Sequence, residues 1–332
     1  DYPTEWATTK NSLGTAWRIL PKGDKAENLI KSIDCHEAAL QVFTREKSPI
    51  AWAVTQSDLG HAWLNLPTGD RAANLNKAIR CLQAALQEFS RTDEPIPWAY
   101  AQEAMGMATH RLAVNEQSGS LAKARECYES ALEGFTKQDH PTDWGRIQCS
   151  LGQVWAELTL GDRKTNLRKA IDCYRASLEV VSRQSDPNTW AYTQNSLAAA
   201  WVEIGGGRDA EILNKAIKCR QAALQVFTKE STPFDWALTQ NLLGLLWVDI
   251  PTGDREENIR KAIECFEAAL QVFTKQDDPT RWAQTKNMLG AAWRRLEAGG
   301  RERNVLNAIG CHQAALQIIT KETAPLEWAS TQ

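Results

Sequence analysis

Residues 233–250, PFDWALTQNLLGLLWVDI, and residues 255–275, REENIRKAIECFEAALQVFTK, decide the fold of this chain. In the first stretch Trp236, Leu243 and Trp247 recur at helical spacing and share one face of a helix. The second stretch has the same periodicity, and no part of the sequence alternates apolar and polar residues with the period of two typical of strands. The two stretches therefore predict a pair of helices, which we call helix A and helix B.

The same pattern recurs every 46 residues throughout the 332-residue chain. Eight tryptophans mark the period, and they are Trp6, Trp52, Trp98, Trp144, Trp190, Trp236, Trp282 and Trp328. A second tryptophan follows eleven residues after the first in every complete unit except one, in which Thr109 takes its place. Such a period predicts a repeat array, in which each unit covers its apolar faces by packing on its neighbours.

The period divides the chain into seven complete units and part of an eighth. The expected units are residues 1–46, 47–92, 93–138, 139–184, 185–230, 231–276 and 277–322, with the partial unit at 323–332. We predict that residues 1–332 form a single array. Positions within a unit are numbered from its first residue, so Trp236 is at position 6 of the sixth unit.

Polar residues and prolines predict where the helices begin. A polar residue precedes a proline at the expected start of helix A in the pairs Ser48-Pro49, Thr232-Pro233 and Asp278-Pro279. Such a pair supplies an N-cap and a proline at the first helical position. The spacings Asp24…Glu27 and Asp254…Glu257 are typical of capping boxes at the start of helix B.

Two motifs in the sixth unit resemble the tetratricopeptide repeat (TPR). They are Leu243-Gly244-x-x-Trp247 in helix A and Ala262-x-x-x-Phe266-x-x-Ala269 in helix B. In this family the glycine and the alanines allow the two helices to approach closely. HEAT and armadillo solenoids have periods of similar length, but these motifs favour TPR.

The unit is longer than the standard TPR of about 34 residues. Thr239-Gln240-Asn241 and the leucines that follow it resemble the extended kinesin-light-chain type and its bacterial relatives. The resemblance implies an all-α fold, a right-handed superhelical solenoid of seven antiparallel helix pairs plus the start of an eighth. It also implies that helix A lines a concave groove that binds proteins or peptides.

Composition excludes several classes of function. The net charge is −3, with 38 basic and 41 acidic residues, so no basic field favours nucleic acid. No apolar run reaches the length of a membrane span, which argues against a membrane protein. Seven of the eight cysteines occupy equivalent positions of successive units, too far apart for disulfides, and we expect them to be core residues of a reduced, cytoplasmic protein.

The helix A face opposite the tryptophans is the predicted groove, and asparagine recurs there at position 11. Asn195, Asn241 and Asn287 are the candidates, because an amide can donate to and accept from the backbone of an extended peptide. The alternative is a local hydrogen bond between neighbouring helices.

Apolar residues gather on the same face in units 5 to 7. They are Tyr192, Leu238, Leu242, Leu245 and Met288. A contiguous apolar patch marks a binding site unless the array itself buries it. An acidic rim of Glu157, Glu203 and Asp249, at position 19, is either functional or a solvated edge. Together these residues predict a partner with apolar anchors and basic residues.

Catalytic constellations are absent from the sequence. None of the motifs of metalloproteases, serine hydrolases or P-loop proteins occurs, and no metal or cofactor is expected. His61 and His110, with Asp58 and Glu103 near them in the pattern, form at best a weak candidate for a metal or acid–base cluster. Cys149 has no histidine in register and is expected to be a passive thiol.

The sequence therefore predicts a protein-interaction scaffold that is not an enzyme and binds a peptide or protein segment in its groove. The alternative is a sensor or regulatory segment of a larger bacterial effector, linked to a peptidase or NTPase, with catalysis outside this chain. The ends of the sequence suggest a third property. No polar capping helix closes the array, so we expect either part of a longer chain or an array that stacks end to end on a second copy.

Overall fold

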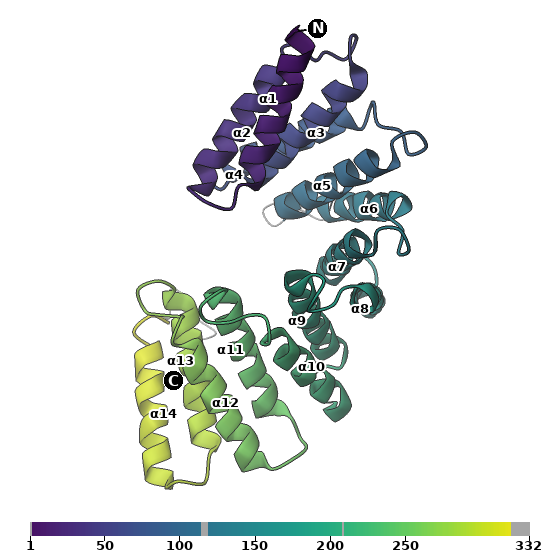
Figure 1. Ribbon diagram of the computed structural model, residues 1–332. Coiled ribbons are helices and arrows are strands. Elements are labelled where there is room, and N and C mark those ends of the chain that lie inside the picture. Colours follow the sequence, from purple (N-terminus) through teal and green to yellow (C-terminus); the bar gives the residue numbers. More distant parts are fainter. Residues whose placement is uncertain (1, 114–118, 208, 320–332) are drawn as a thin grey trace. The chain divides into compact units, whose positions relative to one another are not determined.

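The computed structural model describes residues 2–113, 119–207 and 209–319, and these ranges form α-helices without a strand (Figure 1). In chain order the helices are α1 (Tyr2–Ile19), α2 (Lys25–Ala39), α3 (Pro49–Asn65), α4 (Arg71–Ala85), α5 (Pro95–Ala113), α6 (Gly119–Gly134), α7 (Pro141–Glu157), α8 (Arg163–Val180), α9 (Pro187–Ile204), α10 (Ala210–Ala223), α11 (Pro233–Asp249), α12 (Arg255–Ala269), α13 (Pro279–Arg295) and α14 (Arg301–Ala315).

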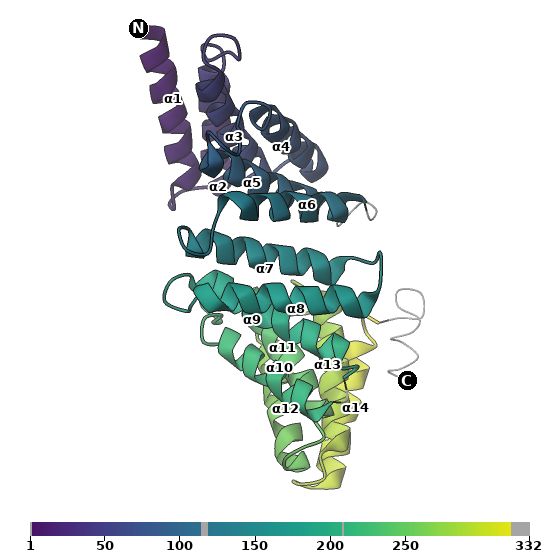
Figure 2. The same cartoon turned by 90° about the vertical axis from the view of Figure 1, so that its right-hand side faces the viewer.

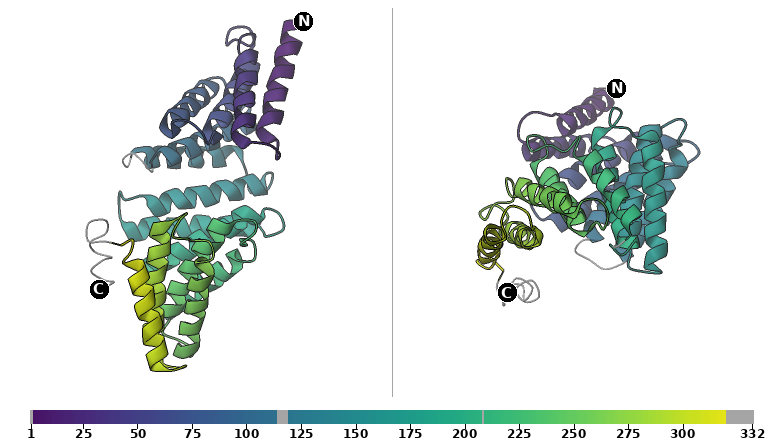
Figure 3. Two further views of the ribbon diagram at one scale, coloured as in Figure 1. Left: turned by 90° about the vertical axis from the view of Figure 1, so that its left-hand side faces the viewer. Right: turned by 90° about the horizontal axis from the view of Figure 1, so that it is seen from below.

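The chain divides into two compact units, unit 1 (Asp1–Val181) with α1 to α8 and unit 2 (Ser182–Gln332) with α9 to α14. The names unit 1 and unit 2 are kept for these two, and the 46-residue repeats are called the first to the seventh unit. Within unit 1 and within unit 2, every odd-numbered helix packs against the even-numbered helix that follows it. Figure 2 shows this pairing for α7 and α8 in unit 1, and the left view of Figure 3 shows it for the two last helices of unit 2. The predicted all-α fold of helix pairs is thus confirmed, while the predicted eighth unit, 323–332, lies outside the described residues.

Aspartates begin five of the B helices (α2, α4, α8, α10 and α12), and two of them have the spacing that predicted a cap. Asp24 Oδ1 accepts a hydrogen bond from Glu27 N at 2.8 Å, and Asp254 Oδ1 accepts one from Glu257 N at 3.1 Å. Each bond satisfies one of the free N–H groups of a first helical turn. The A helices are less uniform, because the Ser48 and Thr232 side chains make no capping bond. The prediction of side-chain caps at these two residues is wrong, although a proline follows each of them.

The B helices end earlier than predicted. In the sixth unit the helix stops at Ala269, whereas the sequence suggested residue 275. The backbone then tightens, because Gln271 N and Val272 N donate to carbonyls three residues back rather than four. This turn places the buried Phe273 against Ala237 of helix A, so tertiary packing overrides the helical periodicity at this end.

Glycine at position 14 brings the two helices of a pair together. A Cβ atom on Gly244 would lie 2.7 Å from Cε1 of the buried Phe266, at position 36 of the same unit. Gly14 faces His36, and Gly152 faces Tyr174, at similarly short distances. The glycine of the Leu-Gly motif therefore matters in these units because only hydrogen fits between helix A and the side chain at position 36.

An asparagine at position 28 fastens the loop between the helices, which the sequence analysis did not single out. Asn28 Nδ2 donates to Lys22 O at 2.9 Å, and Asn258 Nδ2 donates to Thr252 O at 2.8 Å. Asn304 donates to two carbonyls, those of Leu296 and Ala298, both at 2.9 Å. These amides satisfy loop carbonyls that would otherwise have no partner inside the array.

The second tryptophan row is not the buried core that the sequence suggested. Of its members, Trp155 is buried and the others are partly exposed. A lysine at position 31 covers five of the six rings, all but Trp293: Lys77 Nζ lies 3.8 Å from the centre of Trp63, and Lys169 Nζ lies 4.0 Å from that of Trp155. These five rings are therefore shielded by cation–π contacts with helix B, which the helical periodicity of the sequence does not reveal.

The cysteines are free thiols, and burial raises the pKa of most of them. The pKa of Cys81 is raised to about 11 and that of Cys265 to about 12, in both cases chiefly by burial. Thiols of this kind remain protonated near neutral pH and are poor nucleophiles. Across the described ranges, none of the helices combines the length and apolar character needed to cross a bilayer.

Candidate functional site

The A helices of unit 1 enclose a pocket of about 490 Å³. Its lining residues come mainly from α1, α3, α5 and α7, and they are Arg18, Val54, Ser57, Asp58, His61, Phe89, Pro97, Tyr100, Glu103, Met107 and Arg146. Pockets of this size, with mostly apolar walls and a few convergent polar groups, are the usual form of a binding site.

The pocket follows from the repeat. Val54, Tyr100 and Arg146 share position 8 of three successive units, and His61 and Met107 share position 15. Residues at these positions lie on one face of helix A, so stacked helices bring them together. This is the face that the sequence analysis assigned to the groove. The pocket, however, lies in the first four repeats rather than in the fifth to the seventh.

The apolar wall of the pocket is formed by Val54, Phe89, Pro97, Tyr100 and Met107. The Tyr100 ring packs edge-on against Phe135, with the ring centres 4.7 Å apart. Its hydroxyl donates to Asp143 Oδ2 at 3.4 Å, which fixes the ring over the opening. Such a wall suits an aromatic or aliphatic side chain of a partner.

A buried carboxylate–guanidinium pair forms the floor. Glu103 is buried and bonds to the guanidinium of Arg146, which also donates to Asp143 Oδ1 at 2.7 Å. Burial raises the pKa of Glu103 to about 6, and Arg146 opposes that shift. Burial lowers the pKa of Arg146, but the two facing carboxylates more than offset it, so the pKa is raised overall. The floor therefore carries a compensated charge pair at neutral pH.

Asp58 anchors the other side of the pocket. Its Oδ2 accepts from Asn11 Nδ2 at 3.2 Å and from the Thr15 hydroxyl at 3.3 Å, and its Oδ1 lies 3.7 Å from Arg18 Nη2. The Arg18 Nε is buried without a hydrogen-bond partner in the described part of the chain. The carboxylate is therefore satisfied, whereas the guanidinium retains a free donor at the pocket.

His61 is neutral in this setting. Burial, together with the nearby Arg18 and Arg146, lowers its pKa to about 4, although Asp58 opposes the shift. None of the hydrogen bonds among the described residues involves its ring nitrogens. A neutral imidazole offers one donor and one acceptor to a ligand, so His61 can bond to a peptide group of a partner.

A metal or acid–base role for this cluster gains no geometric support. The pocket brings His61, Asp58 and Glu103 together, but His110 lies elsewhere, with its Nε2 2.9 Å from Glu157 Oε2. Within the described ranges no group of three or more histidine, cysteine, aspartate or glutamate side chains could hold a metal ion. Cys149 is buried.

The predicted apolar groove residues of unit 2 lie on its A helices, at positions 8, 12 and 15 of their repeats. Tyr192 is exposed, and its hydroxyl donates to Asp235 Oδ2 at 2.8 Å. Leu238, Leu245 and Met288 are partly buried against neighbouring core clusters. Leu242 is also partly exposed. The patch therefore exists as a half-buried surface, of which Tyr192 is the most exposed member.

The asparagines at position 11 are less accessible than a helical wheel suggests. Asn241 is buried, and Asn195 and Asn287 are partly exposed. Asn287 Oδ1 lies 2.8 Å from His312 Nδ1, and Asn195 Nδ2 donates to Thr239 Oγ1 at 2.6 Å. Helix A has neighbours on several sides, and position 11 faces helix B and the next helix A. These two amides make the local bonds given above as the alternative.

The acidic rim residues lie on the surface. Glu157, Glu203 and Asp249 are all exposed. Glu157 is within bonding distance of His110 of the preceding unit, as described above. Exposed carboxylates of this kind contribute little to stability.

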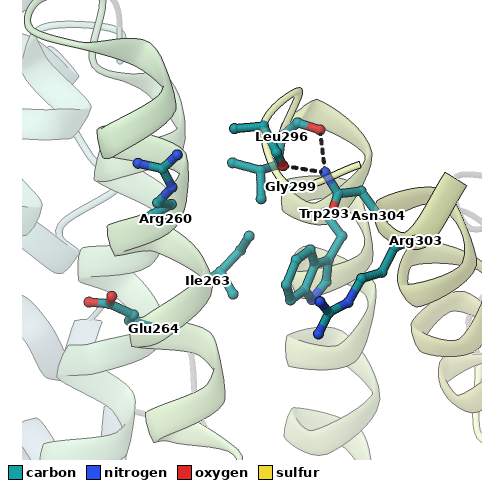
Figure 4. A pocket seen from close by; sticks show the side chains of 9 residues that line it. Arg260, Ile263, Glu264, Trp293, Leu296, Gly299, Arg303 and Asn304 are labelled. Carbon is teal, nitrogen blue, oxygen red and sulfur yellow. Dashed lines mark hydrogen bonds between the residues drawn. The ribbon is translucent and has the colours of Figure 1, made fainter. Parts of the chain in front are cut away.

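A second pocket, of about 310 Å³, lies where α12, α13 and α14 meet in unit 2 (Figure 4). Figure 4 shows Ile263 and Trp293 facing one another across it, with Arg303 beside the indole ring. Asn304 at its upper end is occupied by the two loop carbonyls described above. None of the predicted groove residues lines this pocket, and we do not assign it to the helix A face.

Solved structures share this fold of successive helix pairs. BtubC (BKLC) from P. vanneervenii is 20% identical, with a TM-score of 0.53 over 74% of this chain and 89% of BtubC. The C-terminal part of a TPR repeat-containing protein from Cytophaga hutchinsonii is 12% identical, with a TM-score of 0.52 over 94% of this chain and 95% of that chain. A chain of the APC/C hetero-tetramer Cut9-Hcn1 is 16% identical, with a TM-score of 0.51 over 96% of this chain and 51% of that chain.

No protein-family model and no curated protein sequence matches the chain. The structural likenesses show that the fold is a TPR-like helical-repeat solenoid, as the two sequence motifs predicted. At these identities they show the fold alone, because repeat scaffolds of one fold serve many functions.

Proposed function

We propose that this chain is a protein-interaction scaffold that binds an extended or helical segment of another protein along the helix A face. The observation that carries this proposal is the pocket of about 490 Å³ in unit 1, with its apolar wall and its neutral His61. A few anchoring side chains contribute most of the binding energy in such interfaces. We assign the anchor position to this pocket.

The groove residues of unit 2 belong to the same proposal. Tyr192, Leu238, Leu242, Leu245 and Met288 would contact further apolar anchors, and Asn195, Asn241 and Asn287 would contact the peptide backbone. The acidic rim of Glu157, Glu203 and Asp249 would attract basic residues of the partner. The exposure of Tyr192 supports this assignment, whereas the local bonds of Asn195 and Asn287 favour a structural role for those two.

The finer classification belongs to the same proposal. We infer that residues 1–332 form one continuous array of units of the kinesin-light-chain type, and that the chain is not itself an enzyme. The motif Thr239-Gln240-Asn241 supports the first inference. In the alternative, the array is the sensor or regulatory segment of a larger bacterial effector, and the same face would bind its ligand.

We also propose that two copies associate end to end through the kind of interface that recurs between successive repeats, in which positions 33 and 13 pack together, as Ile33 and Leu59 do. Light scattering at increasing concentration should show an association that Leu13→Glu abolishes, and a monomer at every concentration would exclude it.

A peptide-display selection tests the main proposal. The full chain is presented to a random peptide library as wild type, as Met107→Arg, and as Leu160→Arg. Met107 lines the pocket, whereas Leu160 is an exposed residue in a loop elsewhere in unit 1. Circular dichroism checks that both variants keep the wild-type helix content.

We expect wild type and Leu160→Arg to enrich the same peptides with an aromatic or aliphatic anchor, and Met107→Arg to lose them. In unit 2, the pair Asn241→Ala with Leu242→Asp should weaken enrichment, with Leu306→Asp on the exposed surface of α14 as its control. The proposal is wrong if no peptide is enriched by wild type, or if Met107→Arg enriches the same peptides as wild type.

A further inference from the structure

Position 36 of helix B holds a permanent cation in one unit only. The residues at this position are His36, Leu82, Tyr128, Tyr174, Arg220, Phe266 and His312. The other six side chains are neutral at pH 7 and fill the space beside helix A. Arg220 therefore brings a full positive charge to a place where the repeat otherwise packs rings and aliphatic groups.

The guanidinium of Arg220 is poorly satisfied. The side chain is 4% exposed, and its Nε is buried without a hydrogen-bond partner among the described residues. Its single bond runs from Nη1 to Asn195 Oδ1 at 3.4 Å, longer than a typical N–H···O bond. Burial lowers the pKa of Arg220 to about 10, which still leaves the group charged at neutral pH.

No carboxylate neutralises this charge within the part of the chain that the structure describes. Among the described residues, no carboxylate oxygen lies within 4.0 Å of the Arg220 guanidinium nitrogens. Arg146 in unit 1 shows the ordinary arrangement, because Glu103 and Asp143 both face its guanidinium. A buried charge without such a partner is costly, and proteins keep one mainly where it binds something.

The first two units show that a carboxylate fits beside this position. His36 Nδ1 lies 2.7 Å from Asn11 Oδ1, and the Nδ2 of the same amide donates to Asp58 Oδ2 at 3.2 Å. Asp58 is at position 12 of the following unit. The corresponding residue beyond Arg220 and Asn195 is Leu242, so the carboxylate present in the first case is missing in the second.

Arg220 reaches the helix A face through Asn195. That amide also donates to Thr239 Oγ1 of α11, so the guanidinium lies beneath the junction of α9 and α11. Tyr192 of α9 bonds to Asp235 of α11 across the same junction. Tyr192 of α9 and Leu242 of α11 are the apolar groove residues on these two helices, and both are at least partly exposed.

We propose that the junction of α9 and α11 is a carboxylate-binding site, in which Arg220 and Asn195 hold an acidic group of the bound peptide next to an apolar residue. This rests on the proposed function and specifies the partner further. Alongside the basic residues attracted by the rim, the segment carries one acidic group that reaches the buried guanidinium. A carboxylate is favoured because a guanidinium binds it through two parallel hydrogen bonds.

The first arm of the test uses acetate as the probe and needs no peptide. The full chain is labelled with ¹⁵N-arginine, and the Nε–Hε resonance of Arg220 is assigned by its loss in Arg220→Leu. Sodium acetate is then compared with sodium chloride and with acetamide at constant ionic strength. We expect acetate alone to shift the Arg220 resonance in a saturable way. An equal response to chloride, or no response to acetate, would overturn the proposal.

The second arm compares the binding of synthetic peptide arrays by wild type, Arg220→Leu and Arg183→Leu. Arg183 is an exposed arginine elsewhere in unit 2. Circular dichroism checks that Arg220→Leu keeps the wild-type helix content. Peptides with free and with amidated C-termini distinguish a chain-end carboxylate from an acidic side chain. We expect acidic peptides to bind wild type and Arg183→Leu equally, and Arg220→Leu about 30-fold more weakly or worse.

The outcomes separate the two proposals. If peptides bind without preference for an acid, and equally to Arg220→Leu, the carboxylate site is wrong while the peptide-binding function stands. If no peptide binds but acetate shifts the Arg220 resonance, the site stands and the peptide-binding function is wrong.

Discussion

Replacing the buried Arg220 by leucine should make the protein more stable. Burial lowers the pKa of this group well below its usual range, to about 10, and the bond to Asn195 is long. One pKa unit corresponds to about 1.4 kcal/mol, so holding the charge inside costs the folded state about 3 kcal/mol. The lost hydrogen bond returns about 1 kcal/mol of that. Arg220→Leu should therefore raise the local stability by about 2 kcal/mol, as when buried charges elsewhere are replaced by apolar side chains.

Native-state hydrogen exchange measures this change where it occurs. Repeat arrays open locally, so the exchange of α10 amides is a better probe than a single melting temperature. A gain of about 2 kcal/mol corresponds to roughly 30-fold slower exchange. The control Arg183→Leu alters an exposed side chain that bonds to Gln225, and it should change exchange little. Unchanged or faster exchange in Arg220→Leu would refute the reasoning, because it would mean that the charge is already well compensated.

Three further substitutions probe the packing that positions the site. Burial lowers the pKa of His36 to about 4, so between pH 6.5 and 4 the unfolded chain binds a proton that the folded chain does not. The free energy of unfolding therefore falls by about 3 kcal/mol as the pH falls through this window. Urea titrations of His36→Phe should lack this part of the loss, whereas the part due to His61 remains. Gly244→Ala places a Cβ atom against the buried ring of Phe266 and should lower stability by about 1–3 kcal/mol in thermal unfolding, whereas a gain would show that helix propensity dominates. Asn304→Ala leaves two loop carbonyls without their donor and should cost about 1–3 kcal/mol, and unaltered exchange in the loop before α14 would contradict that role.

The repeat period predicted the helix pairs well because each unit has the same packing problem. Apolar spacing placed helix A of the sixth unit at residues 233–250, and the structure has α11 at Pro233–Asp249. The sequence predicted helix ends and side-chain exposure less well where tertiary contacts determine them. The end of helix B depends on how Phe273 packs on Ala237, and the exposure of Trp63 depends on Lys77 lying across it. Neither contact has a signal in local periodicity.

The site was predicted only in part, for a related reason. A helical wheel identified positions 8 and 15 as facing away from the tryptophans, and the pocket uses these positions. It could not say in which units they enclose a hollow, because that depends on the sizes of Val54, Met107 and their neighbours from four helices. It also treated position 11 as open, although Asn241 is buried. Arg220 did have a signal, since a permanent charge at a position otherwise filled by rings is visible in the sequence.

The central claim is that the helix A face of unit 1 binds a peptide anchor. Isothermal titration of a peptide enriched by the wild-type chain tests it most directly, with wild type, Met107→Arg and Leu160→Arg compared under one condition. Loss of a buried apolar anchor site should weaken binding by about tenfold or more in Met107→Arg, with Leu160→Arg equal to wild type. Equal affinity of all three proteins would contradict the account.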